Sequence, residues 1–313
     1  MSPSIRNTNV LVTGAFGFIG THLVRKLASL GCNVVAIGHG KPSDDNEITK
    51  KIKLIDGDIN DFGIVERQVD KIDALVHLAA FIPSNQEDSS CAEECLKTNA
   101  ITTLRLAEMC VNRKKKVRFI YLSAAQTYAQ SRIPVEENGA QFPVFRAPYY
   151  LTSKLAGEIF TENLRLSKGL PAFILKVGSC YGPRISKRNV AARFMGQASQ
   201  GLPLKVTAPN TKCDFVYVSN VVDAIVKSLT STKFGIYNIG SGKLHSILEL
   251  AQMVAKTYPE RKVKIVVVDQ HQKKDQSFSP FIMRKARKYL DYNPIKLQEG
   301  LRRYRKEMER SAP

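Results

Sequence analysis

The amino-acid sequence predicts an α/β fold in which a doubly wound parallel sheet is covered by helices on both faces. Over the first 180 residues, short apolar runs rich in β-branched residues alternate with longer amphipathic stretches. Continuous apolar strands that alternate with helices are typical of a parallel sheet buried on both faces. The chain has 313 residues, of which 43% are apolar and 24% charged, as in a globular protein with a substantial core.

Six strands and three helices are expected in this region. The strands are Asn9–Thr13, Asn33–Ile37, Lys51–Ile55, Ala74–Leu78, Val117–Leu122 and Ala172–Val177, and the helical patterns are Thr21–Leu30, Ala100–Cys110 and Ser153–Leu166. Beyond residue 180 the pattern loosens around Pro183, Pro203 and Pro209, and from about Met283 it indicates a basic amphipathic helix. A second region is therefore expected after the sheet.

Charge is the unusual property of this chain. It carries 47 basic and 28 acidic residues, a formal net charge of +19, which suits anionic ligands from nucleotide phosphates to nucleic acid. Without a nucleic-acid motif, a solvated helix face explains the basic tail better, and nucleic acid stays a minor alternative. No apolar run approaches the roughly 20 residues of a membrane span, and the N-terminus has no signal-peptide pattern. The six cysteines and five histidines show no metal spacing, so we expect buried thiols, no metal and a cytoplasmic protein.

A glycine-rich turn directly follows the first strand. Gly14, Gly17 and Gly20 stand in a GxxGxxG arrangement, with Phe16, Phe18 and Ile19 between them, before a helical stretch. Gly14 permits the tight turn, Gly17 a close approach of backbone to a pyrophosphate, and Gly20 close packing of the helix on the sheet. The helix N-terminus supplies N–H groups to the phosphates. The strand before it and the helix after it make dinucleotide binding the favoured interpretation.

The end of the second strand bears on which dinucleotide is bound. A carboxylate there would hydrogen-bond the adenosine ribose of NAD. The sequence instead runs Ile37-Gly38-His39-Gly40-Lys41, which leaves room for a 2′-phosphate that His39 or Lys41 would pair with. NADP is slightly favoured over NAD, and a plain polar turn is the alternative.

Tyr150 and Lys154 form a third pattern at the start of a helical stretch. The YxxxK spacing places both side chains on one helix face, one turn apart. A nearby ammonium is expected to lower the pKa of the phenol from its reference value of about 10, so that it carries protons near neutrality.

With these motifs the chain resembles the extended short-chain dehydrogenase/reductases, of the NAD-dependent epimerase/dehydratase family that acts largely on nucleotide sugars. Further matches follow in the family's order: Asp58-Ile59, His77-Leu78-Ala79-Ala80, Thr98-Asn99-Ala100, Tyr181-Gly182-Pro183-Arg184, Phe215-Val216-Tyr217-Val218, Tyr237-Asn238-Ile239-Gly240 and Asp291-Tyr292-Asn293-Pro294.

The resemblance implies a Rossmann domain of residues 1–177 plus about 213–240, and a smaller discontinuous substrate domain of about 178–212 and 241–313. Tyr150 would be the acid/base, and Lys154 would bind the nicotinamide ribose and tune Tyr150. Besides the glycine turn, Tyr150 and Lys154, the residues implied at the cofactor are Asp58, Ile59, Leu78, Ala79, Ala80, Asn99 and Val177. The resemblance also implies a homodimer that joins the helices beginning near Cys95 and Tyr149 in a four-helix bundle.

The sequence departs from the family around the fifth strand. The family's Ser or Thr that hydrogen-bonds the reacting oxygen is replaced by Ala124, and losing such a donor costs on the order of 10²–10³ in rate. We expect Ser123 to take over this catalytic role if the strand twists, and Thr127 is the other hydroxyl nearby. Ala125 and Gln126 lack the acidic pair of the family's 4,6-dehydratases, which disfavours dehydration.

The substrate side departs as well. Lys176 replaces an Arg of the family, Ser179 an Asn, and Cys213, next to Lys212, an Arg that grips substrate phosphate. Lysine lacks the bidentate fork of arginine, so a diphosphate is less strongly specified. Ser179, Arg184 and Lys212 are the expected substrate contacts.

Three functions therefore remain. The leading one is 4-keto reduction or epimerisation of a nucleotide-linked sugar with NAD or NADP. The second is reduction or dehydrogenation of a non-sugar carbonyl compound. The third is a nucleotide- or RNA-binding protein whose catalysis has decayed.

Overall fold

A seven-stranded, all-parallel sheet forms the centre of the molecule. The computed structural model describes residues 5–40, 52–141, 147–268 and 277–310. The strand order is β10-β6-β5-β4-β1-β2-β3. The strands are β1 (Asn9–Thr13), β2 (Asn33–Gly38), β3 (Ile52–Asp56), β4 (Ala74–His77), β5 (Arg118–Ala124), β6 (Ala172–Val177) and β10 (Gly235–Ile239). The six expected strands are confirmed to within two residues at each end, except that Lys51 lies outside the described residues.

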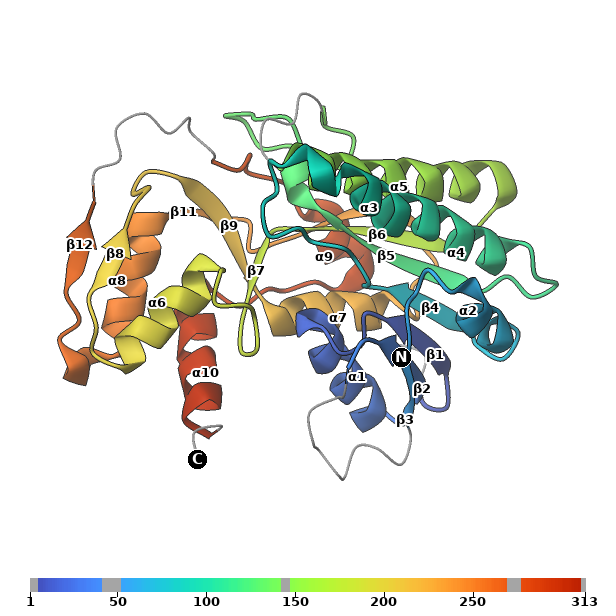
Figure 1. Cartoon of the computed structure of the whole chain (residues 1–313), viewed down its shortest axis with the longest axis horizontal. Helices are drawn as coiled ribbons and strands as arrows, with labels where there is room; N and C mark the ends of the chain where they lie inside the picture. The colour runs from blue at the N-terminus through green and yellow to red at the C-terminus, as the bar shows by residue number, and fades with distance from the viewer. Residues whose placement is uncertain (1–4, 41–51, 142–146, 269–276, 311–313) are drawn as a thin grey trace.

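Helices cover both faces of this sheet, as predicted (Figure 1). On one face lie α1 (Phe18–Ser29) and α7 (Val218–Ser228); on the other lie α2 (Phe62–Val69), α3 (Ala92–Leu96), η3 (Lys97–Ile101), α4 (Thr102–Val111) and α5 (Pro148–Lys168). Side chains alternate along each strand, so Val10 and Val12 pack in one core and Leu11 in the other. The sheet is thus a buried layer between two helical layers, which makes this a Rossmann-type α/β fold.

A smaller part lies beyond the carboxyl ends of the strands, on the left in Figure 1. It contains a three-stranded sheet in the order β11-β9-β7 and a two-stranded sheet of β12 and β8. Its elements are β7 (Ser179–Tyr181), α6 (Val190–Ser199), β8 (Leu204–Val206), β9 (Lys212–Tyr217), β11 (Leu244–Ser246), α8 (Ile247–Thr257), η5 (Pro259–Arg261), β12 (Ile265–Val267) and α10 (Leu297–Arg310). Two short helical turns, η2 (Ser89–Cys91) and η4 (Ala125–Thr127), complete the larger part.

The division into two domains stays a prediction, and two segments lie differently from the expected boundaries. β9 was expected with the large sheet but pairs with β7 and β11 of the small one. α9 (Arg284–Leu290) was expected with the substrate domain but packs against β10 and α7.

The expected C-terminal helix is in fact two helices, α9 and α10. α9 ends at Leu290, and the next residue, Asp291, has a left-handed φ of +46°. Pro294 follows, and it disfavours helical backbone at the residue before it, so α10 begins only at Leu297. Among the residues that the structure describes, no helix is long and apolar enough to cross a membrane.

Candidate active site

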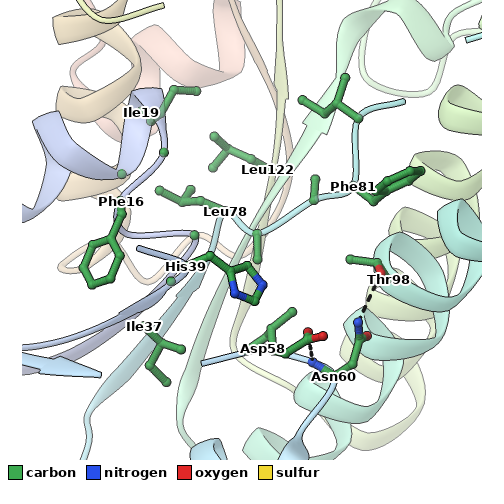
Figure 2. A pocket seen from close by; sticks show the side chains of 18 of the residues that line it. Phe16, Ile19, Ile37, His39, Asp58, Asn60, Leu78, Phe81, Thr98 and Leu122 are labelled. Atoms are coloured by element: carbon green, nitrogen blue, oxygen red, sulfur yellow. Dashed lines mark hydrogen bonds between the residues drawn. The ribbon is translucent and has the colours of Figure 1, made fainter. Parts of the chain in front are cut away.

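A cavity of about 540 Å³ opens at the carboxyl ends of β1, β2 and β4, where the strand order reverses (Figure 2). Crevices at this point of doubly wound sheets are the usual ligand sites. In Figure 2, Phe16 and Ile19 lie on one side of the cavity, and Phe81 and Thr98 on the other. Twelve of the predicted cofactor residues line it: Gly14, Phe16, Gly17, Phe18, Ile19, Gly20, His39, Asp58, Ile59, Leu78, Ala79 and Ala80.

The glycines of the turn are required by close contacts. Gly14 has a φ of +63°, and a Cβ there would lie 2.6 Å from the backbone nitrogen of Ala79. A Cβ at Gly20 would lie 2.2 Å from the carbonyl oxygen of Gly14. The close contact that Gly20 allows is thus with the turn between β1 and α1, and its role in packing the helix on the sheet stays a prediction. The open cradle that results fits a dinucleotide.

The end of β2 carries no carboxylate, and packing explains part of this. A Cβ at Gly38 would lie 3.0 Å from the ring of Phe16, so any larger residue would press against that ring. His39 is exposed and lines the cavity. The carboxylate at the end of β3, Asp56, accepts a hydrogen bond from the Gly40 N–H at 3.2 Å. Lys41, the other expected phosphate partner, lies outside the described residues.

Asn60 connects the floor of the cavity to η3 and α4, and the sequence analysis missed it. Its N–H donates to Asp58 Oδ1 at 2.8 Å, and its amide donates to Thr98 Oγ1 at 3.3 Å (Figure 2). Its Oδ1 accepts from the Thr102 hydroxyl at 2.7 Å. Asn60 directly follows the Asp58-Ile59 motif, and this position could have identified it as a candidate site residue.

Asn99 lies behind the cavity rather than in its lining. It belongs to the π-helical turn η3, where its amide donates to Phe81 O and to Ser153 Oγ, both at 2.9 Å. Its Oδ1 accepts from the Phe81 N–H at 2.8 Å. Asn99 thus ties the segment after β4 to α5, and a direct contact of Asn99 with the cofactor stays a prediction.

Tyr150 and Lys154 lie on the first two turns of α5, as the spacing predicts, and neither lines the 540 Å³ cavity. Burial lowers the pKa of Lys154 to about 7, although the negative charge of Glu158 raises it. The Lys154 Nζ lies 4.3 Å from the centroid of the Tyr121 ring, and the Tyr121 hydroxyl donates to Lys154 O at 3.1 Å. Burial, with a smaller effect of Cys95, raises the pKa of Tyr150 to about 12. The expected lowering of this pKa by Lys154 is therefore wrong, because burial of the phenol and the smaller effect of Cys95 both raise it.

The two hydroxyls near Ala124 already have partners. Ser123 is buried and donates to Glu158 Oε2 at 2.8 Å, whereas Thr127 donates to Ala124 O at 2.8 Å. The regular strand β5 points Ser123 toward α5. A hydroxyl has one proton, so Ser123 would have to break its bond to Glu158 to serve a reacting oxygen. Its catalytic role stays a prediction that this bond does not favour.

Lys176 lies inside the protein, not on the substrate side where the sequence analysis placed it. Its Nζ donates to both carboxylate oxygens of Glu158 at 2.9 Å, to Thr127 Oγ1 at 2.7 Å and to Gln141 Oε1 at 2.9 Å. Both charged side chains are at most 2% exposed. Burial lowers the pKa of Lys176, and Glu158 opposes this change.

The remaining predicted residues lie on several different elements of the described structure. Val177 is buried at the end of β6, beside Ala124. Ser179 is partly buried in β7, and Lys212 is exposed at the start of β9. Arg184 has a left-handed φ of +70° and lines a second cavity of about 590 Å³, formed with α1, α6 and α10.

Comparison with known proteins extends these observations. The sequence model of the NAD dependent epimerase/dehydratase family matches residues 10–240. UDP-N-acetyl-alpha-D-glucosaminuronate decarboxylase of Bacillus cytotoxicus is 32% identical over 261 residues, which cover 77% of this chain and 78% of that protein. UDP-glucuronic acid decarboxylase 3 of Arabidopsis thaliana is 28% identical over 313 residues. The matched region covers 94% of this chain and 87% of that protein.

A solved structure with a similar fold is MoeE5 in complex with UDP-glucuronic acid and NAD. It superposes with a TM-score of 0.83 at 27% identity and covers 97% of this chain and 100% of MoeE5. The glycine cradle and the Tyr150–Lys154 pair follow one another along the chain in the order that the sequence resemblance implied. The chain therefore belongs to the NAD dependent epimerase/dehydratase family.

Proposed function

We propose that this protein is an NAD(P)-dependent enzyme of nucleotide-linked sugars that reduces a 4-keto group or epimerises the corresponding carbinol. The observation that carries the proposal is the placement of Tyr150 and Lys154 on α5, which Asn99 ties to the rim of the dinucleotide cradle through Ser153. Relatives named as UDP-sugar decarboxylases and a dTDP-4-dehydro-6-deoxy-D-allose reductase support a sugar nucleotide as the substrate class.

The residues of this chain divide the chemistry among them. The dinucleotide, when bound in the cradle, supplies or accepts the hydride at the sugar carbon. The Tyr150 hydroxyl gives its proton to the sugar oxygen during reduction or takes it during oxidation. A pKa of about 12 keeps this phenol protonated at neutral pH, so it can donate a proton to the sugar oxygen. Lys154, buried beside the Tyr121 ring, holds the positive charge that stabilises the phenolate.

The substrate contacts are Ser179, Arg184 and Lys212 in this proposal. The cations of Arg184 and Lys212 suit the diphosphate, and Ser179 stands where the family has an asparagine. Alanine variants are expected to raise KM with little change in kcat, since these residues bind ground state and transition state alike. Arg184 faces its own cavity, so an unchanged KM in Arg184→Ala would remove it from the substrate site.

The test of the function combines cofactor oxidation with product analysis. Purified protein is incubated with NADH or NADPH and a 4-keto nucleotide sugar, and separately with NAD and UDP-glucose or UDP-glucuronic acid. Reduction consumes the reduced cofactor, epimerisation changes the sugar without net consumption, and decarboxylation releases CO₂ from the uronic acid. Tyr150→Phe should bind the cofactor and lose turnover. Wild-type turnover in that variant, or activity on non-sugar carbonyls alone, would refute the proposal.

NADP is the slightly preferred cofactor in this proposal. The support is a β2 end without a carboxylate, with exposed His39 at the cavity and Gly38 confined by the Phe16 ring. His39→Asp should shift the preference to NAD, because a carboxylate accepts from the ribose hydroxyls and repels a 2′-phosphate. Titration calorimetry with both dinucleotides measures the shift. Tighter binding of NAD by the wild type would contradict the preference.

The protein forms a homodimer through α3, η3 and α5 in this proposal. Leu96, Ile101, Ile159 and Leu166 leave 43–70% of their surface exposed on these neighbouring helices. Exposed apolar side chains on neighbouring helices are typical of an interface. Six cysteines that form no disulfide fit a reducing compartment, and we place the dimer in the cytoplasm.

A further inference from the structure

Three side chains stand in a row across the sheet, below the cavity. Thr13 is the register partner of His77, and His77 that of Tyr121, so all three point to the face covered by α4 and α5. His77 is fully buried, and its ring stacks on Tyr121 with centroids 5.8 Å apart and planes at 22°. No function for this histidine follows from the sequence alone.

His77 occupies the middle of a hydrogen-bonded chain. The Ala79 N–H donates to Thr13 Oγ1 at 3.3 Å, and Thr13 Oγ1 lies 2.8 Å from His77 Nδ1. On the other side, His77 Nε2 lies 3.0 Å from Thr103 Oγ1, whose proton goes to Asn99 O at 2.7 Å.

Counting protons along this chain fixes the form of the imidazole. The single proton of the Thr103 hydroxyl is used at Asn99, so His77 Nε2 must donate to Thr103. His77 Nδ1 is then the acceptor for the Thr13 hydroxyl. The opposite tautomer would leave the Thr13 proton without an acceptor in the chain. Burial and, to a smaller extent, the Lys154 cation lower the pKa of His77 to about 3, so the ring is neutral at physiological pH.

The two ends of this hydrogen-bonded chain, Ala79 and Asn99, lie at the two halves of the candidate active site. Ala79 lines the cavity, and its nitrogen is the atom that a side chain at Gly14 would strike. Asn99 holds Ser153, the residue before Lys154. We propose that His77, neutral and protonated at Nε2, is a positioning residue that fixes the dinucleotide cradle relative to α5 and thus to Tyr150 and Lys154. The inference rests on the proposed function for its catalytic meaning.

The tautomer is tested first, in the protein without ligands. Nitrogen-15 NMR should show a protonated Nε2 and an unprotonated Nδ1, with no titration between about pH 6 and about pH 8. The hydrogen-bonded chain from Ala79 through Thr13, His77 and Thr103 to Asn99 is called the relay below. A ring that titrates in this range, or a proton on Nδ1, would overturn the relay. Because no cofactor is needed, this measurement decides the relay even if the protein binds no dinucleotide, a result that would refute the proposed function instead.

Two variants then break the relay at opposite ends. A glutamine amide reaches the position of Nε2, so His77→Gln keeps the bond to Thr103 and loses the one to Thr13. An asparagine amide reaches the position of Nδ1, so His77→Asn does the reverse. His77→Gln should weaken dinucleotide binding about tenfold, the scale of one buried hydrogen bond, with kcat retained. His77→Asn should lower kcat about tenfold with near wild-type dinucleotide binding.

The control is Ser228→Ala, which removes a buried hydroxyl bonded to Ala224 O in α7, away from the relay. It should lower Tm without changing dinucleotide binding or kcat. A histidine with only a structural role would give two variants that lose stability and show the same change in binding and kcat. That pattern, or wild-type kinetics in both variants, would overturn the positioning role.

Discussion

The buried ion pair of Lys176 and Glu158 allows a stability prediction with a defined size. Lys176→Met replaces the ammonium by an apolar group of similar length. Glu158 would keep the Ser123 hydroxyl as a partner but lose both bonds from Lys176 while it remains 2% exposed. A carboxylate left in that environment cannot be solvated by water, so the folded state loses stability.

Removing one member of a buried ion pair costs about 3–5 kcal/mol of unfolding free energy. For a chain of 313 residues the unfolding entropy is about 0.66 kcal/mol/K, so Tm should fall by about 5–8 °C. The exposed pair of Lys227 and Asp291, at 3.1 Å, provides the matched control. Lys227→Met should cost less than about 1 kcal/mol, because water solvates the charge that remains.

Thermal unfolding followed by circular dichroism measures both variants, together with the double variant Glu158→Gln, Lys176→Met. The double variant removes both charges and should recover to within about 2 kcal/mol of the wild type. If Lys176→Met were as stable as Lys227→Met, or if the double variant were no more stable than Lys176→Met alone, the assignment of the penalty to an unpaired Glu158 would be refuted.

Three further predictions follow from the site. Below about pH 7, Lys154→Met should be more stable than the wild type, because burying the Lys154 ammonium destabilises the folded state. The difference should shrink between about pH 7 and pH 10.5, where the unfolded chain binds a proton that folded Lys154 does not. Measurements of Tm against pH test this prediction. Gly20→Ala should abolish the rise in Tm on adding dinucleotide, since its Cβ would strike Gly14 O, whereas Gly196→Ala, with nothing within 4 Å, should retain it. Ile159→Glu should give a monomer in size-exclusion chromatography with light scattering, and a dimer that persists would exclude α5 from the interface.

The sequence predicted the sheet well because its signals are local. A strand buried on both faces needs a continuous apolar run, and a glycine turn needs its glycines in consecutive positions, so both are visible in a few residues. The break between α9 and α10 was also present locally, in Asp291 and Pro294, but the basic periodicity on either side concealed it.

The surroundings of Tyr150 and Lys154 were not predictable in the same way. Lys176 was assigned to the substrate side because it stands where the family has an arginine, yet its partner Glu158 comes from another element, 18 residues away. The pKa of Tyr150 was misjudged because the spacing to Lys154 is visible in sequence, whereas burial depends on the whole packed helix layer. Such effects are set by tertiary contacts, and no local pattern reports them.

The π-helical turn η3 requires a fixed number of residues between α3 and α4. A π turn is equivalent to an α-helix with one inserted residue. Deleting one residue between Lys97 and Ile101 would restore regular α geometry and leave α3 in nearly the same phase relative to α4, but it would remove the bulge that contains Asn99. Asn99 would then lose the backbone position from which its amide reaches Phe81 and Ser153. A single-residue deletion here would separate the cradle from α5 while Tyr150 and Lys154 kept their positions on α5.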